Sequence, residues 1–173
     1  MNDPPFLLVP LDQAHDRTRF NSGSEALDRY FREQVTQDMR RRVAACFVAL
    51  DGKQQIAGYY TLASASILLA DLPASSGKKL PRYPTVPAVR MGRLAVDQAF
   101  KDRGLGGALL ADALNRATHS EIAAHALMVY AKDASAAAFY VHHGFIVLPN
   151  SPLTLFMPLA TVLALRKAEK TPR

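Results

Sequence analysis

The chain has 173 residues, enough for one domain with a substantial core and too few for two comfortable domains. Hydrophobic residues make up 49% of it and charged residues 21%, the values of an ordinary globular protein. The net charge of +6 favours an anionic partner, either a nucleic acid or an anionic cofactor, although many basic proteins bind neither. The single cysteine, Cys46, excludes an internal disulfide and any zinc site built from cysteines, and its apolar neighbours suit a small core residue.

The sequence also predicts a cytoplasmic protein without a membrane partner. No apolar run is long enough to cross a bilayer. The N-terminus lacks the charged region that precedes the apolar part of a secretory signal.

The first quarter of the chain predicts an edge strand and a helix. Phe6–Val9 is a short apolar run between prolines, and residues 12–20 are polar and suit a loop. Ser22 to Glu25 fits the S-x-x-E capping box that starts a helix. Apolar residues then recur at helical spacing, at Leu27, Tyr30, Phe31, Val35 and Met39.

Three arginines, Arg40–Arg42, close this predicted helix. Cations stabilise the negative end of the helix dipole and need no ligand there. Three in succession on a basic protein also suit a nucleic-acid contact, so both interpretations stay open, with helix stabilisation ranked first.

An antiparallel hairpin and a long loop follow. Val43–Leu50 and residues 55–66 are typical of strands, and Asp51-Gly52 between them is a hairpin-turn signal. Residues 73–87 predict a basic loop of a size that is often functional or mobile in compact domains.

The stretch from Arg90 to Leu114 carries the clearest chemistry. Its run Arg93–Val96 is typical of a buried strand, and the pattern predicts a helix from Gly106. Its glycines therefore lie where a helix begins, and there backbone N–H groups lack an internal partner and the helix dipole is positive. An anion can approach these donors closely because glycine has no side chain, and Arg103 adds a cation. These residues alone leave two interpretations open, a phosphate or pyrophosphate site and a loop that only turns the chain.

The last third predicts more strands and one more helix. A buried strand lies within His125–Lys132, and Asp133 can cap a short helix over residues 134–142 that Gly144 ends. Two final strands are expected over residues 145–148 and 153–158, and the charged tail from Arg166 is expected to fray. The whole pattern indicates a single α/β domain over residues 1–173 with a mixed sheet and a flexible tail at about 166–173.

Three segments together resemble the GNAT acyltransferases. Arg103–Ala108 matches the R/Q-x-x-G-x-G/A signature, with Arg103, Gly106 and Ala108 at the fixed positions. Arg93–Asp97 is similar to the strand of this family that binds acetyl-CoA. Ala138-Phe139-Tyr140 with His143-Gly144-Phe145 resembles the block beside the cofactor thiol. The resemblance covers nearly the whole chain and implies the GNAT fold, a mixed, mostly antiparallel sheet of about six or seven strands flanked by about four helices.

A narrower resemblance is to the GNAT toxins of bacterial toxin–antitoxin modules. It rests on Gly58–Leu62, on Leu80–Pro84 with Pro87, on Arg90–Asp97, and on Phe20–Gly23 leading into Leu27–Tyr30. Such toxins acetylate the α-amine of aminoacyl-tRNA and so stop translation. The resemblance implies acetyl-CoA as co-substrate and no metal, with aminoacyl-tRNA and a ribbon-helix-helix antitoxin as partners and a homodimer as the assembly.

The resemblance also implies the site residues. Backbone groups of Leu94, Ala95 and Val96 would hold the pantetheine arm, and the Val96 N–H would donate to the oxyanion. Tyr140 would be the general acid for the CoA thiolate, the alternative being that it only packs a short helix on the sheet. The residues expected at the pyrophosphate are Arg103, Gly104, Leu105, Gly106, Gly107 and Ala108.

No residue is predicted to be a general base, because Glu33, Asp97 and the histidines have no positional support. An α-amino group has a pKa of about 7.7–8.0 and an ester-linked one should be lower, so a neutral fraction exists without a base. This chemistry suits an aminoacyl ester better than a lysine, whose pKa is about 10.4.

Contacts with tRNA phosphates are expected from the basic residues near the acceptor side, Arg90, Arg93, Lys78, Lys79 and Arg82, with Arg40–Arg42 as a further group. Two other functions stay open. One is a GNAT enzyme that acetylates a small amine, an antibiotic or a protein N-terminus. The other is a non-enzymatic protein that keeps the fold and binds a nucleic acid or a repressor, against which the intact glycines and Tyr140 argue.

Overall fold

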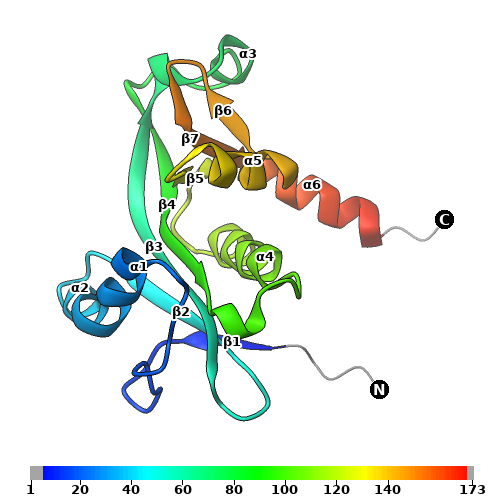
Figure 1. Ribbon diagram of the computed structural model, residues 1–173. Coiled ribbons are helices and arrows are strands. Elements are labelled where there is room, and N and C mark those ends of the chain that lie inside the picture. Colours follow the sequence, from blue (N-terminus) through cyan, green and yellow to red (C-terminus); the bar gives the residue numbers. More distant parts are fainter. Residues whose placement is uncertain (1–5, 171–173) are drawn as a thin grey trace. The chain divides into compact units, whose positions relative to one another are not determined.

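The computed structural model describes residues 6–170 (Figure 1). Its strands are β1 (Leu7–Pro10), β2 (Ala45–Leu50), β3 (Ile56–Leu68), β4 (Thr85–Val96), β5 (Ala126–Tyr130), β6 (Ile146–Leu148) and β7 (Ser151–Pro158). Its α-helices are α1 (Glu25–Arg29), α2 (Val35–Arg40), α3 (Ala74–Gly77), α4 (Leu105–Thr118), α5 (Ala134–His142) and α6 (Leu159–Lys170). A π-helical turn, Tyr30–Gln34, joins α1 to α2. Over the described part of the chain, no helix is both long and apolar enough to cross a membrane.

The strands form one sheet in the order β1-β2-β3-β4-β5-β7-β6. Strand β4 pairs with β5 in parallel, and the pairs β1–β2, β2–β3, β5–β7 and β6–β7 are antiparallel. The parallel pair follows from the connection, since α4 carries the chain from the end of β4 back to the start of β5. This confirms the expected α/β class with a mixed, mostly antiparallel sheet.

The described residues divide into two compact units. The first unit comprises residues 6–63 and 92–113, and the second comprises residues 64–91 and 114–170. Strands β3 and β4 each contribute to both units.

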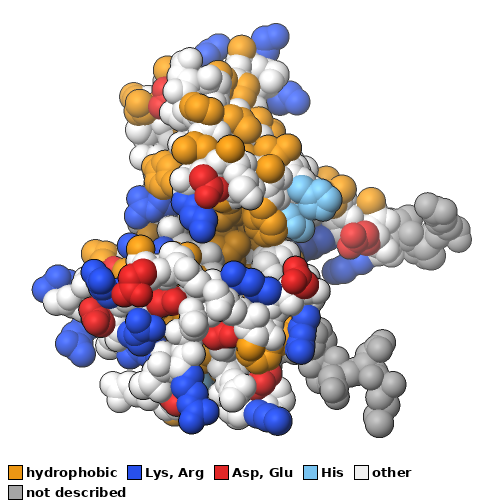
Figure 2. All heavy atoms as spheres, in the orientation of Figure 1, with side chains coloured by type: hydrophobic (Ala, Val, Ile, Leu, Met, Phe, Trp, Pro, Cys, Tyr) orange, Lys and Arg blue, Asp and Glu red, His pale blue; other side chains and the backbone are white. Residues whose placement is uncertain are grey.

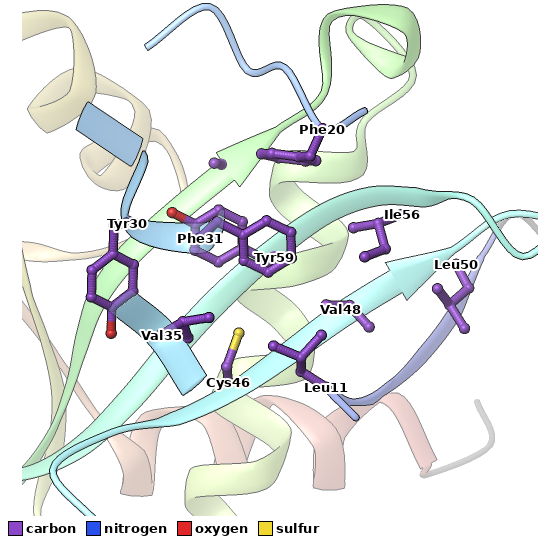
Figure 3. Packing of buried hydrophobic residues seen from close by; sticks show 11 residues of the cluster. Leu11, Phe20, Tyr30, Phe31, Val35, Cys46, Val48, Leu50, Ile56 and Tyr59 are labelled. Carbon is purple, nitrogen blue, oxygen red and sulfur yellow. The ribbon is translucent and has the colours of Figure 1, made fainter. Parts of the chain in front are cut away.

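A buried cluster, here called the α1–α2 cluster, forms the core of the first unit where α1, the π turn and α2 cover β2 and β3 (Figure 3). Its members are Leu11, Phe20, Tyr30, Phe31, Val35, Cys46, Val48, Leu50, Ile56, Tyr59 and Ala95. The Phe31 ring stacks on Tyr59 with 4.1 Å between centroids. Burial raises the pKa of the Cys46 thiol to about 12, so this residue belongs to the core, as predicted.

The π turn explains how adjacent parts of the helix all reach this cluster. Tyr30 and Val35 are both buried, although in a straight α-helix residues five apart point about 140° away from one another. The Val35 N–H instead bonds to the Tyr30 carbonyl, an i→i+5 bond that brings both side chains to the same face.

The start of α1 corrects the sequence prediction. Ser24, and not Ser22, is the N-cap, with its Oγ accepting the Leu27 N–H at 3.4 Å. The Ser22 hydroxyl donates to the carboxylate of Asp28 at 2.7 Å, and the Ser22 N–H donates to the same group. Asp28 is only 5% exposed, and a buried carboxylate is costly unless hydrogen-bond donors surround it. Ser22 supplies these donors and therefore does not cap the helix.

In the second unit, β4 lies beside β5 over Ala88–Met91, and β5, β7 and β6 continue the sheet. Three elements there differ from expectation. Strand β4 begins at Thr85, the predicted loop over residues 73–87 contains α3, and the chain after β7 continues as α6 to Lys170, so residues 166–170 are helical. The rest of the expected tail, 171–173, lies outside the described residues.

Candidate functional site

The N-terminus of α4 is open and rich in free backbone donors. The Ala108 N–H donates to the Gly104 carbonyl at 3.1 Å, which is the first bond of the helix. The N–H groups of Leu105, Gly106 and Gly107 precede it and so have no carbonyl within the helix. Gly104 has a φ of +74°, and no atom lies within 4 Å of the place where a Cβ would stand. A phosphate group fits here because the helix dipole and the donors favour an anion and no side chain blocks them.

Arg103 flanks this helix start on the solvent side. Its side chain is exposed, and its guanidinium carbon lies 5.5 Å from the centroid of the Phe100 ring. The cation is therefore held near the open end of α4 without an ion pair among the described residues.

Close packing fixes α4 against β3. A Cβ on Gly58 would stand 2.8 Å from Cδ1 of Leu109 and 2.9 Å from the Ala95 carbonyl oxygen, so only a glycine allows this approach. The Tyr60 hydroxyl on β3 also donates to the carboxylate of Asp112 on α4. These contacts set where the open helix start lies relative to the sheet within the first unit.

The end of β4 is held in place by burial of Ala95 and by the hydrogen bonds of Asp97. Ala95 is buried in the α1–α2 cluster, whereas Leu94 and Val96 are half-buried, and alternation along a strand places them on the opposite face. The Asp97 N–H donates to the Ala57 carbonyl at 2.8 Å. The Asp97 carboxylate accepts the N–H groups of Ala99 and Asn21, so this acid caps a turn and gains no support as a base.

Arg93, also on β4, lies against an aromatic ring that sequence reasoning placed only in the core. Its guanidinium carbon stands 3.4 Å from the centroid of Tyr30. The Tyr30 hydroxyl donates to Asp38 at 2.8 Å, and the Gln34 side-chain amide donates to the other oxygen of Asp38 at 2.9 Å. Periodicity shows that Tyr30 faces inward, but no sequence signal shows which cation meets its ring.

Tyr140 lies in the second unit, near the end of α5. The N–H of Phe145 bonds to the Tyr140 carbonyl and the N–H of Gly144 to the Val141 carbonyl, the paired bonds of a Schellman C-cap. At the other end, the Asp133 carboxylate accepts the Ala136 N–H at 2.8 Å, as the sequence predicts. The helix that carries Tyr140 is thus fixed at both ends.

The Tyr140 side chain has a buried ring and an accessible hydroxyl. The residue is 7% exposed, and burial raises its pKa to about 12. Its hydroxyl makes no hydrogen bond to any of residues 6–170. Every fully buried side-chain oxygen or nitrogen atom in these residues has a hydrogen-bond partner, so the Tyr140 hydroxyl oxygen is not among the fully buried atoms. The hydroxyl oxygen therefore reaches solvent, protonated and free to donate.

The other basic residues expected to meet RNA are on the surface. Lys78, Lys79 and Arg82 are exposed in the segment between β3 and β4, and Arg90 is half-exposed on β4 beside Met128. Arg40–Arg42 are exposed at the end of α2, an arrangement that suits helix termination and a nucleic-acid contact equally. Residues 6–170 contain no group of three His, Cys, Asp or Glu side chains that could hold a metal ion.

A family comparison identifies the chain. Residues 42–147 match the family described as the acetyltransferase (GNAT) domain, which includes the whole of α4 and α5. The chain belongs to the GNAT acetyltransferases. The expected fold, and the expectation of an enzyme, are confirmed.

Individual relatives of this acetyltransferase are toxins. A protein of Mycobacterium tuberculosis named tRNA-acetylating toxin is 37% identical over 158 residues, covering 90% of this chain and 93% of its own. A probable toxin TacT of Sinorhizobium fredii is 31% identical over 170 residues, covering 92% of this chain and 94% of its own. The narrower resemblance to GNAT toxins is thereby confirmed.

Solved structures agree with this placement. The toxin AtaT in complex with acetyl-methionyl-tRNAfMet has a TM-score of 0.86 and 31% identity, covering 93% of this chain and 99% of its own. An AtaT variant with a tyrosine changed to phenylalanine, bound to the C-terminus of its antitoxin AtaR and to acetyl-CoA, has a TM-score of 0.78 and 25% identity, covering 93% and 98%.

Proposed function

We propose that this acetyltransferase is the toxin of a toxin–antitoxin module that transfers the acetyl group of acetyl-CoA to the α-amine of aminoacyl-tRNA and so blocks translation. The extent of its identity with the mycobacterial tRNA-acetylating toxin carries the proposal. The AtaT complex with an acetylated aminoacyl-tRNA supports the same substrate class. The net charge of +6 supports a polyanionic substrate.

The first unit would bind acetyl-CoA along its own backbone. The N–H groups at the start of α4, from Gly104 to Gly107, would bind the pyrophosphate, with Arg103 beside them, whereas the Ala108 N–H is already bonded to the Gly104 carbonyl. Backbone groups of Leu94–Val96 would pair with the pantetheine arm and bring the thioester to the end of β4. The free donors and the open space at Gly104 support this assignment.

Acetyl transfer would proceed by direct attack. The neutral α-amine adds to the thioester carbonyl, the C–S bond breaks, and the amide forms as the amine loses a proton to solvent. The Val96 N–H would donate to the oxyanion, and a donor of this kind is worth about 10²–10³ in rate. Tyr140 would act as general acid, donate its hydroxyl proton to the departing sulfur and then regain a proton from solvent, and its accessible hydroxyl supports this role.

The proposal extends to the protein partners. We assign a ribbon-helix-helix antitoxin and a second copy of the chain as partners in the cytoplasm, on the resemblance to GNAT toxins. Figure 2 shows hydrophobic side chains gathered over α5, β6 and β7, and Ile146, Val147 and Leu153 are exposed there. Such a patch supports a protein-binding surface. Native mass spectrometry of the chain alone and after co-expression with the neighbouring gene product tests both assignments.

The deciding experiment follows the acetyl group. The protein is incubated with labelled acetyl-CoA and total charged tRNA, and the labelled amino acid is released by mild hydrolysis and identified. We expect label on aminoacyl-tRNA, and a loss of about 10²-fold or more with Tyr140→Phe. Tyr130→Phe removes the hydroxyl of an exposed tyrosine and should leave the rate unchanged. Turnover of acetyl-CoA on a small amine with no label on RNA would replace the proposal with the small-molecule alternative.

A further inference from the structure

Arg93 holds its guanidinium flat on a ring with its donors unused. A distance of 3.4 Å between the guanidinium carbon and the Tyr30 centroid requires the two planes to be nearly parallel, because any steeper angle would drive a nitrogen into the ring. The N–H groups then point sideways rather than at Tyr30. Among residues 6–170, this half-buried guanidinium makes no hydrogen bond and no ion pair. Its charge is balanced only in part, because hydrogen bonds from Gln34 and Tyr30 are the main cause of the lowered pKa of the Asp38 carboxyl and Arg93 only adds to it. The N–H donors of Arg93 therefore remain free for an anion.

The ring beneath Arg93 is itself held in place. Tyr30 is 7% exposed and lies at one end of the α1–α2 cluster (Figure 3). Its hydroxyl is bonded to Asp38, which Gln34 holds from the other side. Tyr30 and Gln34 both belong to the π turn, so this turn fixes the position of the Tyr30 ring. The ring in turn fixes the plane of the Arg93 guanidinium that stacks on it.

The position of Arg93 relates it to the reacting end of the strand. It precedes Val96 by three residues, about 10 Å along a strand. About eight bonds of roughly 1.5 Å separate the α-amine of an aminoacyl ester from the 5′-phosphate of the nucleotide that carries it, again on the order of 10 Å when extended. An arginine at this place on β4 is therefore within reach of the backbone of the substrate's acceptor end.

We infer that Tyr30, braced by Asp38 and Gln34, positions Arg93 as a bidentate anchor for a phosphate of the single-stranded acceptor end of tRNA. This inference rests on the proposed function. A guanidinium offers two parallel N–H donors that match two phosphate oxygens, whereas a lysine offers a single mobile charge. A ring that fixes the plane of the guanidinium removes freedom that would otherwise be lost on binding. Arg93 is the contacting residue, and Tyr30 is a positioning residue.

Four variants separate geometry from charge. Arg93→Ala should raise the KM for total charged tRNA about tenfold or more and reduce the slope of log(kcat/KM) against log[salt] by about 0.7, one phosphate contact. Arg93→Lys should keep the slope and still raise the KM several-fold. Tyr30→Leu should behave like Arg93→Lys, and Tyr30→Phe, which keeps the ring, should stay within about threefold of the parent. In all four, kcat and the Kd for acetyl-CoA should stay unchanged.

The coupling of the two residues is tested by a double variant. Once Arg93 is alanine, adding Tyr30→Leu should raise the KM no further, because Tyr30 acts through Arg93. Arg29→Lys is the matched control, since Arg29 is an exposed arginine on α1 paired with Glu25, and its KM should equal that of the parent.

The opposite outcomes are distinct. Parental KM in Arg93→Lys would show that only charge matters, and additive effects in the double variant would show that Tyr30 acts elsewhere. If Tyr30→Leu fails to fold, Arg93→Lys still decides whether the geometry of the guanidinium or only its charge matters. If the parent protein leaves charged tRNA unacetylated, the proposed function itself fails. If the parent acetylates tRNA while every Arg93 variant keeps its KM, only the present inference fails.

Discussion

Gly58 sets how closely α4 packs on β3 and where the carbonyl of Ala95 lies. An added methyl would meet both a Leu109 side-chain carbon, which can move, and a backbone oxygen, which cannot move without shifting β4. The next residue along β4 is Val96, whose N–H we assign to the oxyanion. At the scale of single residues, the absence of a side chain at Gly58 therefore serves both the packing of α4 on β3 and the position of the backbone that we assign to the chemistry.

We predict that Gly58→Ala lowers the free energy of unfolding by about 1–3 kcal/mol, the usual cost of overpacking a core. The rate of acetyl transfer should also fall, because the backbone at the end of β4 moves. Urea unfolding and steady-state kinetics measure the two effects. Gly52→Ala is the control, since nothing lies within 4 Å of its Cβ position, and its stability should stay within about 0.5 kcal/mol of the parent. A Gly58→Ala protein with parental stability and rate would contradict this account.

The pH dependence of transfer should reflect the substrate amine rather than Tyr140. Burial raises the pKa of Tyr140 to about 12, so its hydroxyl stays protonated throughout the working range. We expect kcat/KM for charged tRNA to rise from pH 6 to pH 8 as the α-amine loses its proton, without a falling limb below about pH 9. A falling limb with a midpoint near pH 8 in initial-rate measurements would point to a different acid.

At the scale of elements, α5 is a short helix whose two caps determine the placement of Tyr140. Asp133 begins it, and the Schellman bonds at Val141 and Tyr140 end it. Only nine residues separate these ends, so the loss of one cap affects the last turn as well.

Asp133→Ala should lower the free energy of unfolding by about 1 kcal/mol, the typical value of an N-cap, and should reduce kcat. Thermal unfolding and the acetylation assay measure both quantities. Asp71→Ala removes an exposed carboxylate outside the helix and serves as control, with neither quantity expected to change. If Asp133→Ala loses stability but keeps its kcat, the helix start does not position Tyr140.

The elements that the sequence predicts well have local causes. The caps of α5 and the hairpin at Asp51 depend on neighbouring residues, and both are found where the sequence places them. The start of α1 was misassigned because a tertiary demand, the buried carboxylate of Asp28, takes Ser22 away from capping. The long β4 was hidden by Pro87, a residue that strand interiors seldom contain, whose carbonyl accepts the His125 N–H at 2.8 Å.

The remaining features differ in how much local signal they carry. Helix α6 buries only Leu159 and Val162, and although Leu159, Val162 and Leu163 recur at helical spacing, the charged residues from Arg166 favour a frayed tail. The glycine-rich helix start was predictable because backbone chemistry alone defines it. The stack of Arg93 on Tyr30 was not, because it joins residues 63 positions apart through a turn of irregular pitch.

At the scale of the whole molecule, buried tyrosines make the fold sensitive to alkali. Burial raises the pKa values of Tyr30, Tyr59 and Tyr140 above the usual tyrosine value, for Tyr140 to about 12. In the unfolded chain each of them ionises near pH 10. Above that pH the unfolded state releases protons that the folded state still holds, so stability is lost as the pH rises toward the folded pKa.

We predict that the free energy of unfolding changes little from pH 7 to pH 9 and then falls by roughly 1.4 kcal/mol per pH unit for each buried tyrosine between pH 10 and 12. Urea unfolding at pH 9, 10 and 11 measures it, with tyrosinate absorbance as a second signal. Tyr83→Phe removes an exposed tyrosine and should leave the pH dependence unaltered. Equal stability at pH 9 and 11 would show that these hydroxyls ionise freely in the folded protein.

The π turn between α1 and α2 makes the length of this segment a functional quantity. Deleting one residue from Tyr30–Gln34 would let this segment return to a regular helix, in which the residues now numbered 30 and 35 would be four apart and about 40° from one another, so both would still face the core. Inserting one residue, or deleting a second, would instead rotate everything after the turn by about 100° relative to what precedes it. Val35 would then leave the core, or Tyr30 would leave Arg93. Related chains that keep the arginine and its ring should therefore have either this turn or a regular helix that is one residue shorter.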